Sequence, residues 1–291
     1  MIELTYDEFC KKFTEQLQLL LGESYLLKKE ETVGYNDTHK EVLLVEKKGS
    51  GCMPRFDLRA YYETHIEGMT IEELAKKAVH GIHAEDIPSE ADIKALLDPE
   101  QIRNRLIIRL LNRKTNESIL KEMPHLPFLD LAITFHLLLE EKKDGTKSIR
   151  VTNKLWEEYM GDSVLQMYRQ ALLNTERLFP ARMVQMEQLL HLSELGISSG
   201  LFIISNPHGI YGAAVLLYDG VQEKIRRILG EAYYVIPSSV HEMLVIRESD
   251  VPDINMLKST ILEVNSTQVA EEDVLSNQLY RFDGEQLVCV E

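Results

Sequence analysis

The stretch from Leu201 to Glu248, LFIISNPHGIYGAAVLLYDGVQEKIRRILGEAYYVIPSSVHEMLVIRE, decides the fold of this chain. It contains short runs rich in apolar and β-branched residues, which are typical of strands buried in a sheet. The predicted strands are Leu201–Ser205, Tyr211–Tyr218, Tyr233–Ile236 and Met243–Arg247. Between the second and third strands, Asp219 can cap a helix that Gly230 ends, because glycine readily adopts a positive φ. We therefore expect a strand–strand–helix–strand–strand unit.

The connectors between these strands carry most of the unusual polar residues. A turn at residues 206–209 follows the first strand, and Pro237 interrupts the last two strands because proline cannot donate to a sheet. Loops held by a rigid sheet often carry binding residues. We expect a binding groove here, with Asn265 at its edge. The candidate binding residues are Asn206, His208, Tyr211, Ser238, Ser239, His241, Glu242 and Asn265.

The rest of the chain indicates two domains in an α+β protein. An acidic stretch from Glu85 to Gln101 separates an N-terminal α+β region, residues 1–98, from a main α+β domain, residues 99–291. No internal repeat is visible. We expect mostly antiparallel sheets with helices packed on one face.

Further elements are predicted from capping residues and periodicity. Capping boxes at Thr5 and Thr70 begin helices, and Asp283-Gly284 predicts a hairpin. Further helices are predicted over Arg55–Glu67, after a cap at Asp162 and from Pro180. Strands are predicted over Phe128–Leu139 and over Arg103–Asn112, where the pattern fits a helix nearly as well.

The charge balance argues against binding nucleic acid. The chain has 32 Lys and Arg against 47 Asp and Glu, a formal net charge of −15, so a phosphate backbone would be repelled. One basic cluster comprises Arg103, Arg105, Arg109, Arg113 and Lys114. In a strand its arginines share one face, which favours a solvated or partner-binding surface over an RNA site. The expected partner is a protein or a small ligand.

Cysteine usage and the N-terminus indicate a cytoplasmic protein. Cys10, Cys52 and Cys289 are far apart and include no CxxC pair, so neither a disulfide framework nor a structural zinc site is expected. The first ten residues, MIELTYDEFC, lack the basic and apolar regions of a signal peptide. No run approaches the roughly 18 apolar residues of a membrane-spanning helix. We therefore expect no membrane segment.

The segment Ser238–Glu242 is the most suggestive of catalysis. A serine nucleophile needs a base within reach and a carboxylate that orients this base. On an extended segment, Ser239 and His241 share a face while Glu242 points away, which makes a poor triad. The zinc motif HExxH is incomplete because Val245 stands where its second histidine belongs.

Asp130 is the most unusual carboxylate, because it interrupts a long apolar run. A buried carboxylate needs a hydrogen-bond partner or a raised pKa, and we favour a structural hydrogen bond over an acid–base role. With no complete constellation, we predict no catalytic residue, no metal and no cofactor. The main hypothesis is a non-enzymatic binding or regulatory module. The alternative is a hydrolase or metal-assisted enzyme that uses His241 and Glu242, with His208 or Asp130 as a further participant.

Segments distributed over nearly the whole chain resemble an uncharacterised bacterial family, domain of unknown function 5688. They are 110–112, 124–125, 128–132, Ala171, 174–175, 205–206, 211–214, 236–242 (IPSSVHE), 263–265 (EVN), Val269 and 275–276. The family has no assigned activity, so the resemblance implies a shared fold and no mechanism.

Overall fold

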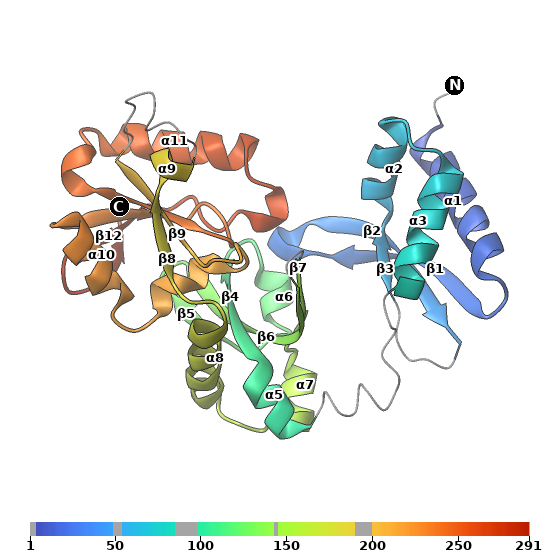
Figure 1. The fold of residues 1–291 in the computed structure, drawn as a ribbon, viewed down its shortest axis with the longest axis horizontal. Coiled ribbons are helices and arrows are strands. Elements are labelled where there is room, and N and C mark those ends of the chain that lie inside the picture. Colours follow the sequence, from blue (N-terminus) through green and yellow to red (C-terminus); the bar gives the residue numbers. More distant parts are fainter. Residues whose placement is uncertain (1–3, 49–53, 85–97, 143–144, 190–199, 291) are drawn as a thin grey trace. The chain divides into compact units, whose positions relative to one another are not determined.

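The computed structural model describes residues 4–48, 54–84, 98–142, 145–189 and 200–290, which Figure 1 draws as ribbon. Its internal contacts divide the chain into two compact units. The N-terminal unit comprises Met1–Gly34 and Thr38–Asp98, and the C-terminal unit comprises Tyr35–Asp37 and Pro99–Glu291. The three residues Tyr35–Asp37 therefore belong with the second unit, although they follow the first strand of the chain.

The N-terminal unit combines an antiparallel sheet with helices (Figure 1). Its elements in chain order are α1 (Tyr6–Leu21), β1 (Tyr25–Val33), β2 (His39–Lys47), β3 (Arg55–Asp57), α2 (Leu58–Ile66) and α3 (Ile71–Ala84). The strand order is β1-β2-β3, and both pairs are antiparallel.

The capping boxes predicted for this unit are confirmed. The Thr5 hydroxyl accepts from the Glu8 backbone N–H at 3.4 Å, and the Glu8 carboxylate accepts from the Thr5 backbone N–H at 2.9 Å. Thr70 and Glu73 make the same reciprocal pair before α3. Each box satisfies two backbone groups that a helix start leaves without partners.

The core of the N-terminal unit lies between α1 and the helices and sheet that pack on it. It includes the buried side chains Phe9, Phe13, Leu17, Leu43, Val45, Leu58, Leu74, Ala78 and Ile82. The helix expected from Arg55 begins later, at Leu58, because Arg55–Asp57 pairs with β2 and Asp57 caps the helix through the Arg59 and Ala60 N–H groups.

The first sheet of the C-terminal unit is built around one long strand. Its elements are α5 (Pro99–Arg105), β4 (Leu106–Asn112), α6 (Glu117–Leu120), β5 (His125–Phe128), β6 (Leu131–Lys142), β7 (Gly145–Arg150), α7 (Asn153–Tyr159) and α8 (Val164–Leu178), with the short helix η1 at Tyr35–Asp37. Strand β6 pairs antiparallel with β4, β5 and β7. In the β6–β7 pair, His136 lies opposite Arg150 and Leu138 lies opposite Ser148.

Two predicted strands of this sheet have different bounds. Residues 103–105 end α5, so the strand begins at Leu106, and the arginines of the basic cluster do not share one strand face. The run 128–139 is divided between β5 and β6 by a turn at Leu129-Asp130, where Leu129 has a φ of 55°. A continuous apolar run has no period, so it cannot reveal a turn inside it.

The second sheet of this unit contains β8 (Arg182–Gln185), β9 (Leu201–Ser205), β10 (Tyr233–Ile236), β11 (Met243–Arg247), β12 (Tyr280–Phe282) and β13 (Leu287–Cys289). Their order is β13-β12-β10-β11-β9-β8, with every pair antiparallel. The intervening helices are α9 (Met186–Leu189), η3 (Gly212–Leu217), α10 (Val221–Leu229), η4 (Glu248–Asp250), α11 (Ile254–Thr267) and η5 (Glu271–Asp273). The hairpin at Asp283-Gly284 is confirmed.

Two element predictions in this sheet are wrong. The run Tyr211–Tyr218 forms the 3-10 helix η3 rather than a strand, and its buried residues Ala213–Leu216 have no amphipathic pattern that distinguishes the two structures. The first part of the helix expected from Pro180 is strand β8, because pairing with β9 overrides the local helical periodicity, and the helix α9 begins only at Met186.

Two predicted helix caps also differ. Gly220, in a left-handed conformation, occupies the cap position of α10 in place of Asp219. Ser163 caps α8 in place of Asp162, which instead forms an ion pair with Arg103 at 2.9 Å. Gly230 ends α10 as predicted, with a φ of 85°. These differences are local, and the antiparallel α+β class is confirmed.

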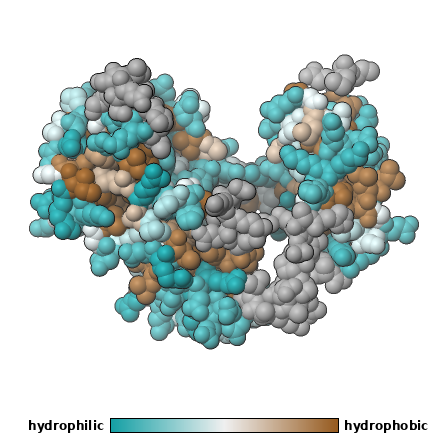
Figure 2. All heavy atoms as spheres, viewed as in Figure 1, coloured by the Kyte–Doolittle hydropathy of each residue, from teal (hydrophilic) through white to brown (hydrophobic). Residues whose placement is uncertain are grey.

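The surface visible in Figure 2 is mostly hydrophilic, with hydrophobic side chains in separate patches. The exposed apolar residues include Leu19 at 76% and Met256 at 69% exposure. Among the helices in the described part of the chain, none combines the length and apolarity needed to cross a membrane.

Candidate functional site

In the turn at residues 206–209 and in the segment 237–242 (PSSVHE), polar side chains hydrogen-bond mainly to the backbone of nearby residues. Asn206 is buried, and its Oδ1 accepts from the His208 backbone N–H at 3.0 Å. The Ser239 hydroxyl accepts from the backbone N–H groups of His241 and Glu242 at 3.1 and 3.2 Å. Such side-chain-to-backbone bonds stabilise turns. The Asn206 and Ser239 side chains therefore shape these loops.

Tyr211 and His241 come together because two backbone segments approach closely. The Ser205 hydroxyl donates to the His241 carbonyl at 2.7 Å, and a Cβ on Gly212 would lie 2.3 Å from the same oxygen. Glycine is therefore required at 212. Next to it, Tyr211 takes a left-handed φ of 51°, which is uncommon for a bulky residue. The Tyr211 and His241 rings stack with centroids 6.2 Å apart and planes 11° from parallel.

Arg109, from β4, is the centre of the site. It is 6% exposed, and its guanidinium carbon lies 3.8 Å from the centroid of the Tyr35 ring and 4.8 Å from that of Tyr211. A cation held against aromatic faces is stabilised by their negative π-electron density. The Arg109 Nε is buried and has no hydrogen-bond partner among the described residues.

The register of the sheet places other polar groups on the same face as Arg109. Arg109 pairs with Thr134 of β6, two residues from His136, and His136 pairs with Arg150 of β7. Because side chains alternate along a strand, all three side chains point to one side. The Arg150 guanidinium carbon lies 5.4 Å from the Tyr35 ring centroid.

His136 contacts the Tyr35 hydroxyl directly and is connected to the Tyr211 hydroxyl through Ser148. The Tyr35 hydroxyl lies 3.4 Å from Nε2, and the Ser148 hydroxyl lies 3.4 Å from Nδ1. Ser148 is also 3.2 Å from the Tyr211 hydroxyl. Burial, with added repulsion from Arg109 and Arg150, lowers the pKa of His136 well below its usual range. His136 is therefore a neutral imidazole.

His241 and Arg109 share the carboxylate of Asp273, from η5. The Asp273 Oδ1 lies 3.4 Å from His241 Nε2 and 3.9 Å from Arg109 Nη2. The other ring nitrogen of His241, Nδ1, is buried and has no partner within the described residues. The side chains of His241 and Asp273 are 38% and 29% exposed, so they form the solvent-facing side of the cluster. We call this cluster the Arg109 site; its members are Tyr35, Arg109, His136, Ser148, Arg150, Tyr211, His241 and Asp273.

The other predicted candidates lie outside the Arg109 site. His208 is exposed and its ring meets Phe179 edge to face, with centroids 5.5 Å apart. Ser238 is buried, and Glu242 is half-buried beside His241 in the chain without pairing with that imidazole. Asn265 is buried in α11, not at its end, and donates to the Ser276 carbonyl at 3.0 Å.

Asp130 is held by hydroxyl groups rather than by a base. Ser276 donates to its Oδ2 at 2.6 Å, and the Tyr280 hydroxyl donates to its Oδ1. Burial and the neighbouring carboxylate raise the pKa of Tyr280 above its usual value, so this phenol keeps its proton and remains a donor. This arrangement is the structural hydrogen bonding that the sequence favoured for Asp130.

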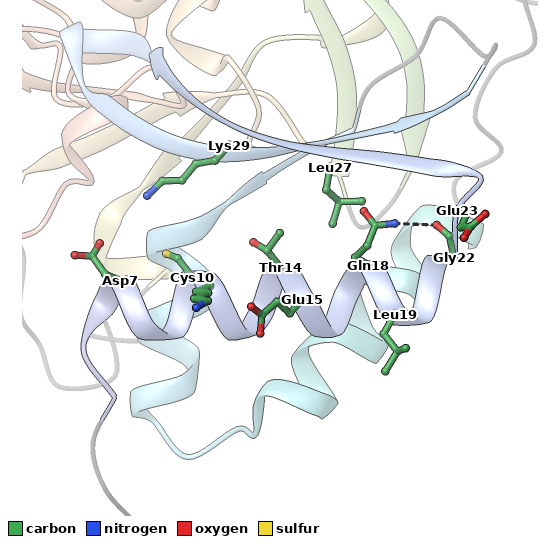
Figure 3. Close-up of a pocket in the computed structure, with 11 residues that line it drawn as sticks. Asp7, Cys10, Thr14, Glu15, Gln18, Leu19, Gly22, Glu23, Leu27 and Lys29 are labelled. Atoms are coloured by element: carbon green, nitrogen blue, oxygen red, sulfur yellow. Dashed lines mark hydrogen bonds between the residues drawn. The ribbon is translucent and has the colours of Figure 1, made fainter.

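The N-terminal unit has a cleft of its own between α1 and β1, drawn in Figure 3. Its volume is 850 Å³, and Cys10, Thr14, Gln18 and Leu27 are among its lining residues. Gln18 donates to the Gly22 carbonyl at 2.8 Å, which secures the end of α1. Burial raises the pKa of the Cys10 thiol, which disfavours the reactive thiolate. This cleft therefore offers space without a reactive group.

Sequence reasoning missed most of the Arg109 site. It identified Tyr211 and His241, and it assigned Arg109 to a solvated or partner-binding basic face. One available signal was that Arg109 and His136 interrupt strongly apolar strands, as Asp130 interrupts its run. Tyr35 and Asp273 carry no such signal, because they come from short 3-10 helices distant in sequence. Within the described part of the chain, no three His, Cys, Asp or Glu side chains are grouped as a metal site.

The C-terminal unit is therefore an α+β fold with antiparallel sheets. Its Arg–Tyr–His cluster is a polar site on one face of a sheet. Residues 6–284 match the family of unknown function DUF5688, and the chain belongs to this family. A search of curated proteins and a search of solved structures both gave no match.

Proposed function

We propose that this protein is a cytoplasmic binding or regulatory module whose C-terminal unit binds a small anionic ligand at the Arg109 site. The observation that carries the proposal is the incomplete neutralisation of Arg109. This side chain is 6% exposed, its Nε lacks a partner among the described residues, and its ion pair with Asp273 is long at 3.9 Å. Buried charges are normally paired and hydrogen-bonded, so a bound anion would complete the site.

The surrounding charges support an anion rather than a cation. Arg109 and Arg150 both flank Tyr35, whereas Asp273 supplies the carboxylate that pairs with this cluster in the described chain. Guanidinium groups bind carboxylates and phosphates through two parallel hydrogen bonds. His241 is half-exposed at the edge of the site, so a ligand can approach from that side.

Thermal unfolding of the full chain at constant ionic strength tests the proposal. Inorganic phosphate, citrate and succinate are the probes. A ligand at ten times its Kd stabilises the folded state by about 1.4 kcal/mol, which corresponds to a rise in Tm of about 2–4 °C. The Arg109→Met variant should lose this rise, whereas Arg113→Met, an exposed arginine close in sequence, should keep it.

Two outcomes would contradict this proposal. One is an equal Tm rise in the wild type and in Arg109→Met; the other is no rise with any of the three anions. If Arg109→Met does not fold, Arg109→Lys serves instead, because it keeps the charge but lacks the planar fork. If the anions raise the Tm of Arg109→Lys as much as they raise that of the wild type, this result would also refute the site.

A hydrolase remains the second candidate because Asp273 lies 3.4 Å from His241 Nε2, in the manner of a carboxylate that orients a base. The carboxylate beside His241 is thus that of Asp273, whereas the hydrolase hypothesis named Glu242. Against catalysis, a general base uses its second nitrogen, and the Nδ1 of His241 is buried. A panel of esterase and phosphatase substrates separates the two functions. Turnover by the wild type that is lost in His241→Gln would replace the binding proposal with a hydrolase.

A further inference from the structure

A second site in the C-terminal unit is a cleft rich in asparagine, and its lining includes none of the members of the Arg109 site. The cleft has a volume of 340 Å³ and lies among α11, η5 and the end of β4. Asn36, Asn112, Asn265 and Asn277 contribute to its wall, together with Leu262, Val274 and one acidic residue, Glu271, and none of its lining residues is aromatic. A cleft with amide and aliphatic groups suits an uncharged ligand that both donates and accepts hydrogen bonds.

Two of these asparagines are fixed in place by their own hydrogen bonds. The Asn36 Nδ2 donates to the Glu271 and Val274 carbonyls at 2.7 and 2.8 Å. The Asn112 Nδ2 donates to the Leu275 carbonyl at 3.0 Å, while its Oδ1 accepts from the Lys114 backbone N–H at 2.9 Å. These bonds make a rigid wall, which lowers the entropy lost when a ligand binds.

Asn265 and Asn277 have hydrogen-bonding capacity left. The Asn265 Nδ2 donates to Asn277 Oδ1 at 2.8 Å, but its own Oδ1 has no partner among the described residues. Asn277 is exposed, and the described chain leaves its Nδ2 without an acceptor. A ligand placed along this pair would find an amide donor in Asn277, and a small shift of Asn265 would present an amide acceptor.

The asparagine cleft continues into a larger and more basic one. The adjoining cleft has a volume of 930 Å³ and shares Asn112, Thr115, Ser276 and Asn277 with the first. Its lining also includes Arg113, Lys114 and Lys121, which are exposed.

The charges in this larger cleft leave cations available for a ligand. No carboxylate of the described residues lies within 4.0 Å of the Arg113, Lys114 or Lys121 side-chain nitrogens. Two carboxylates, Asp130 and Glu117, also line the cleft, and Asp130 is occupied by hydroxyl donors on both oxygens, so the three cations exceed the carboxylates by one charge. An incoming acidic group therefore meets an excess of unpaired positive charge.

We propose that the two clefts form one groove that binds an extended peptide segment. Its main-chain amides lie along Asn265 and Asn277, and its acidic side chains lie toward Arg113, Lys114 and Lys121. A peptide bond carries one donor and one acceptor, which matches the capacity left on the two asparagines. A saccharide is disfavoured because the asparagine cleft offers no aromatic ring on which a sugar could stack.

Selection from a displayed library of random ten-residue peptides on the full-length protein tests the proposal. Enriched sequences should carry Asp or Glu toward one end. A synthetic copy of an enriched peptide is then titrated by fluorescence anisotropy. Asn277→Ala and Lys114→Glu should each weaken its binding by about tenfold, because each removes one hydrogen bond or one charge pair. Both residues are exposed, so these variants should fold.

Matched controls separate the groove from general effects of composition and charge. Asn255→Ala on α11 and Lys224→Glu on α10 change exposed residues that do not line either cleft, and the peptide Kd should stay the same. Arg109→Met should also leave the peptide Kd unchanged, because Arg109 lines neither cleft.

Three outcomes would overturn the inference. The first is a selection that enriches no peptide, and the second is an enriched peptide that binds the wild type and all variants equally. The third is a glycan array in which a saccharide binds the wild type and loses affinity with Asn277→Ala, which would make the groove a sugar site.

Discussion

The buried imidazole of His136 should make the stability of the C-terminal unit depend on pH in a defined window. His136 is 1% exposed, and burial together with Arg109 and Arg150 keeps its pKa well below the usual value of about 6.5. As the pH falls below about 6.5, the unfolded chain takes up a proton that the folded chain does not, so the free energy of unfolding decreases. If the folded form stays neutral, the loss from this residue between pH 7.5 and pH 5.0 is RT ln(1 + 10^1.5), about 2 kcal/mol.

Urea denaturation at several pH values measures this loss. The single tryptophan of the chain, Trp156, lies in α7 of the C-terminal unit, so its fluorescence reports on the relevant unit. His136→Phe removes the titrating group, and its stability should fall by about 2 kcal/mol less than that of the wild type between pH 7.5 and pH 5.0. His125→Phe, at an exposed histidine, should behave as the wild type.

The comparison of pH dependences cancels the other titrating groups, which all three proteins share. His136→Gln replaces His136→Phe if the phenyl ring disturbs the buried cluster. The same loss of stability in the wild type and in the His136 variant would refute the assignment of a neutral, buried imidazole.

Three further substitutions test the packing and hydrogen bonds described above. Gly212→Ala should lower the free energy of unfolding by about 3 kcal/mol, because its Cβ would lie 2.3 Å from the His241 carbonyl; an unchanged urea midpoint would contradict this contact. Thr5→Ala should cost about 1 kcal/mol by removing the capping box of α1, which circular dichroism during urea unfolding can measure; no change would mean that the box contributes little. Tyr280→Phe should cost about 1.5 kcal/mol, since the half-buried Asp130 loses a charge-assisted hydrogen bond; equal stability in a urea titration would show that water replaces the phenol.

The sequence predicted the elements whose signals are local. A capping box needs two residues three positions apart, and the Thr5–Glu8 pair forms as predicted. The Asp283-Gly284 hairpin is also set within a few residues, because Gly284 has a φ of 110° and the Asp283 carboxylate accepts from the Glu285 and Gln286 backbone N–H groups. These elements could be predicted because their energetics depend on near neighbours in the chain.

Two errors in secondary structure arose where the local sequence does not distinguish a helix from a strand. Residues 212–216 are all buried, and a buried helical turn and a buried strand then have the same composition. The strand β8 forms by pairing with β9, and the local sequence after Pro180 that predicted a helix does not reveal this partner. The choice between helix and strand is made by tertiary pairing, which residue order does not reveal.

By itself, the sequence determined the α+β class, the family, the capped helices and most strands, because apolar periodicity and turn chemistry act over short distances. Only the tertiary structure decided the site. Arg109 and His136 share a sheet face through the register of β4 and β6, and Tyr35 and Asp273 reach the cluster from separate 3-10 helices. A buried cation gains its stabilisation from whichever rings and carboxylates the fold brings within a few ångströms. Sequence separation carries no information about that proximity.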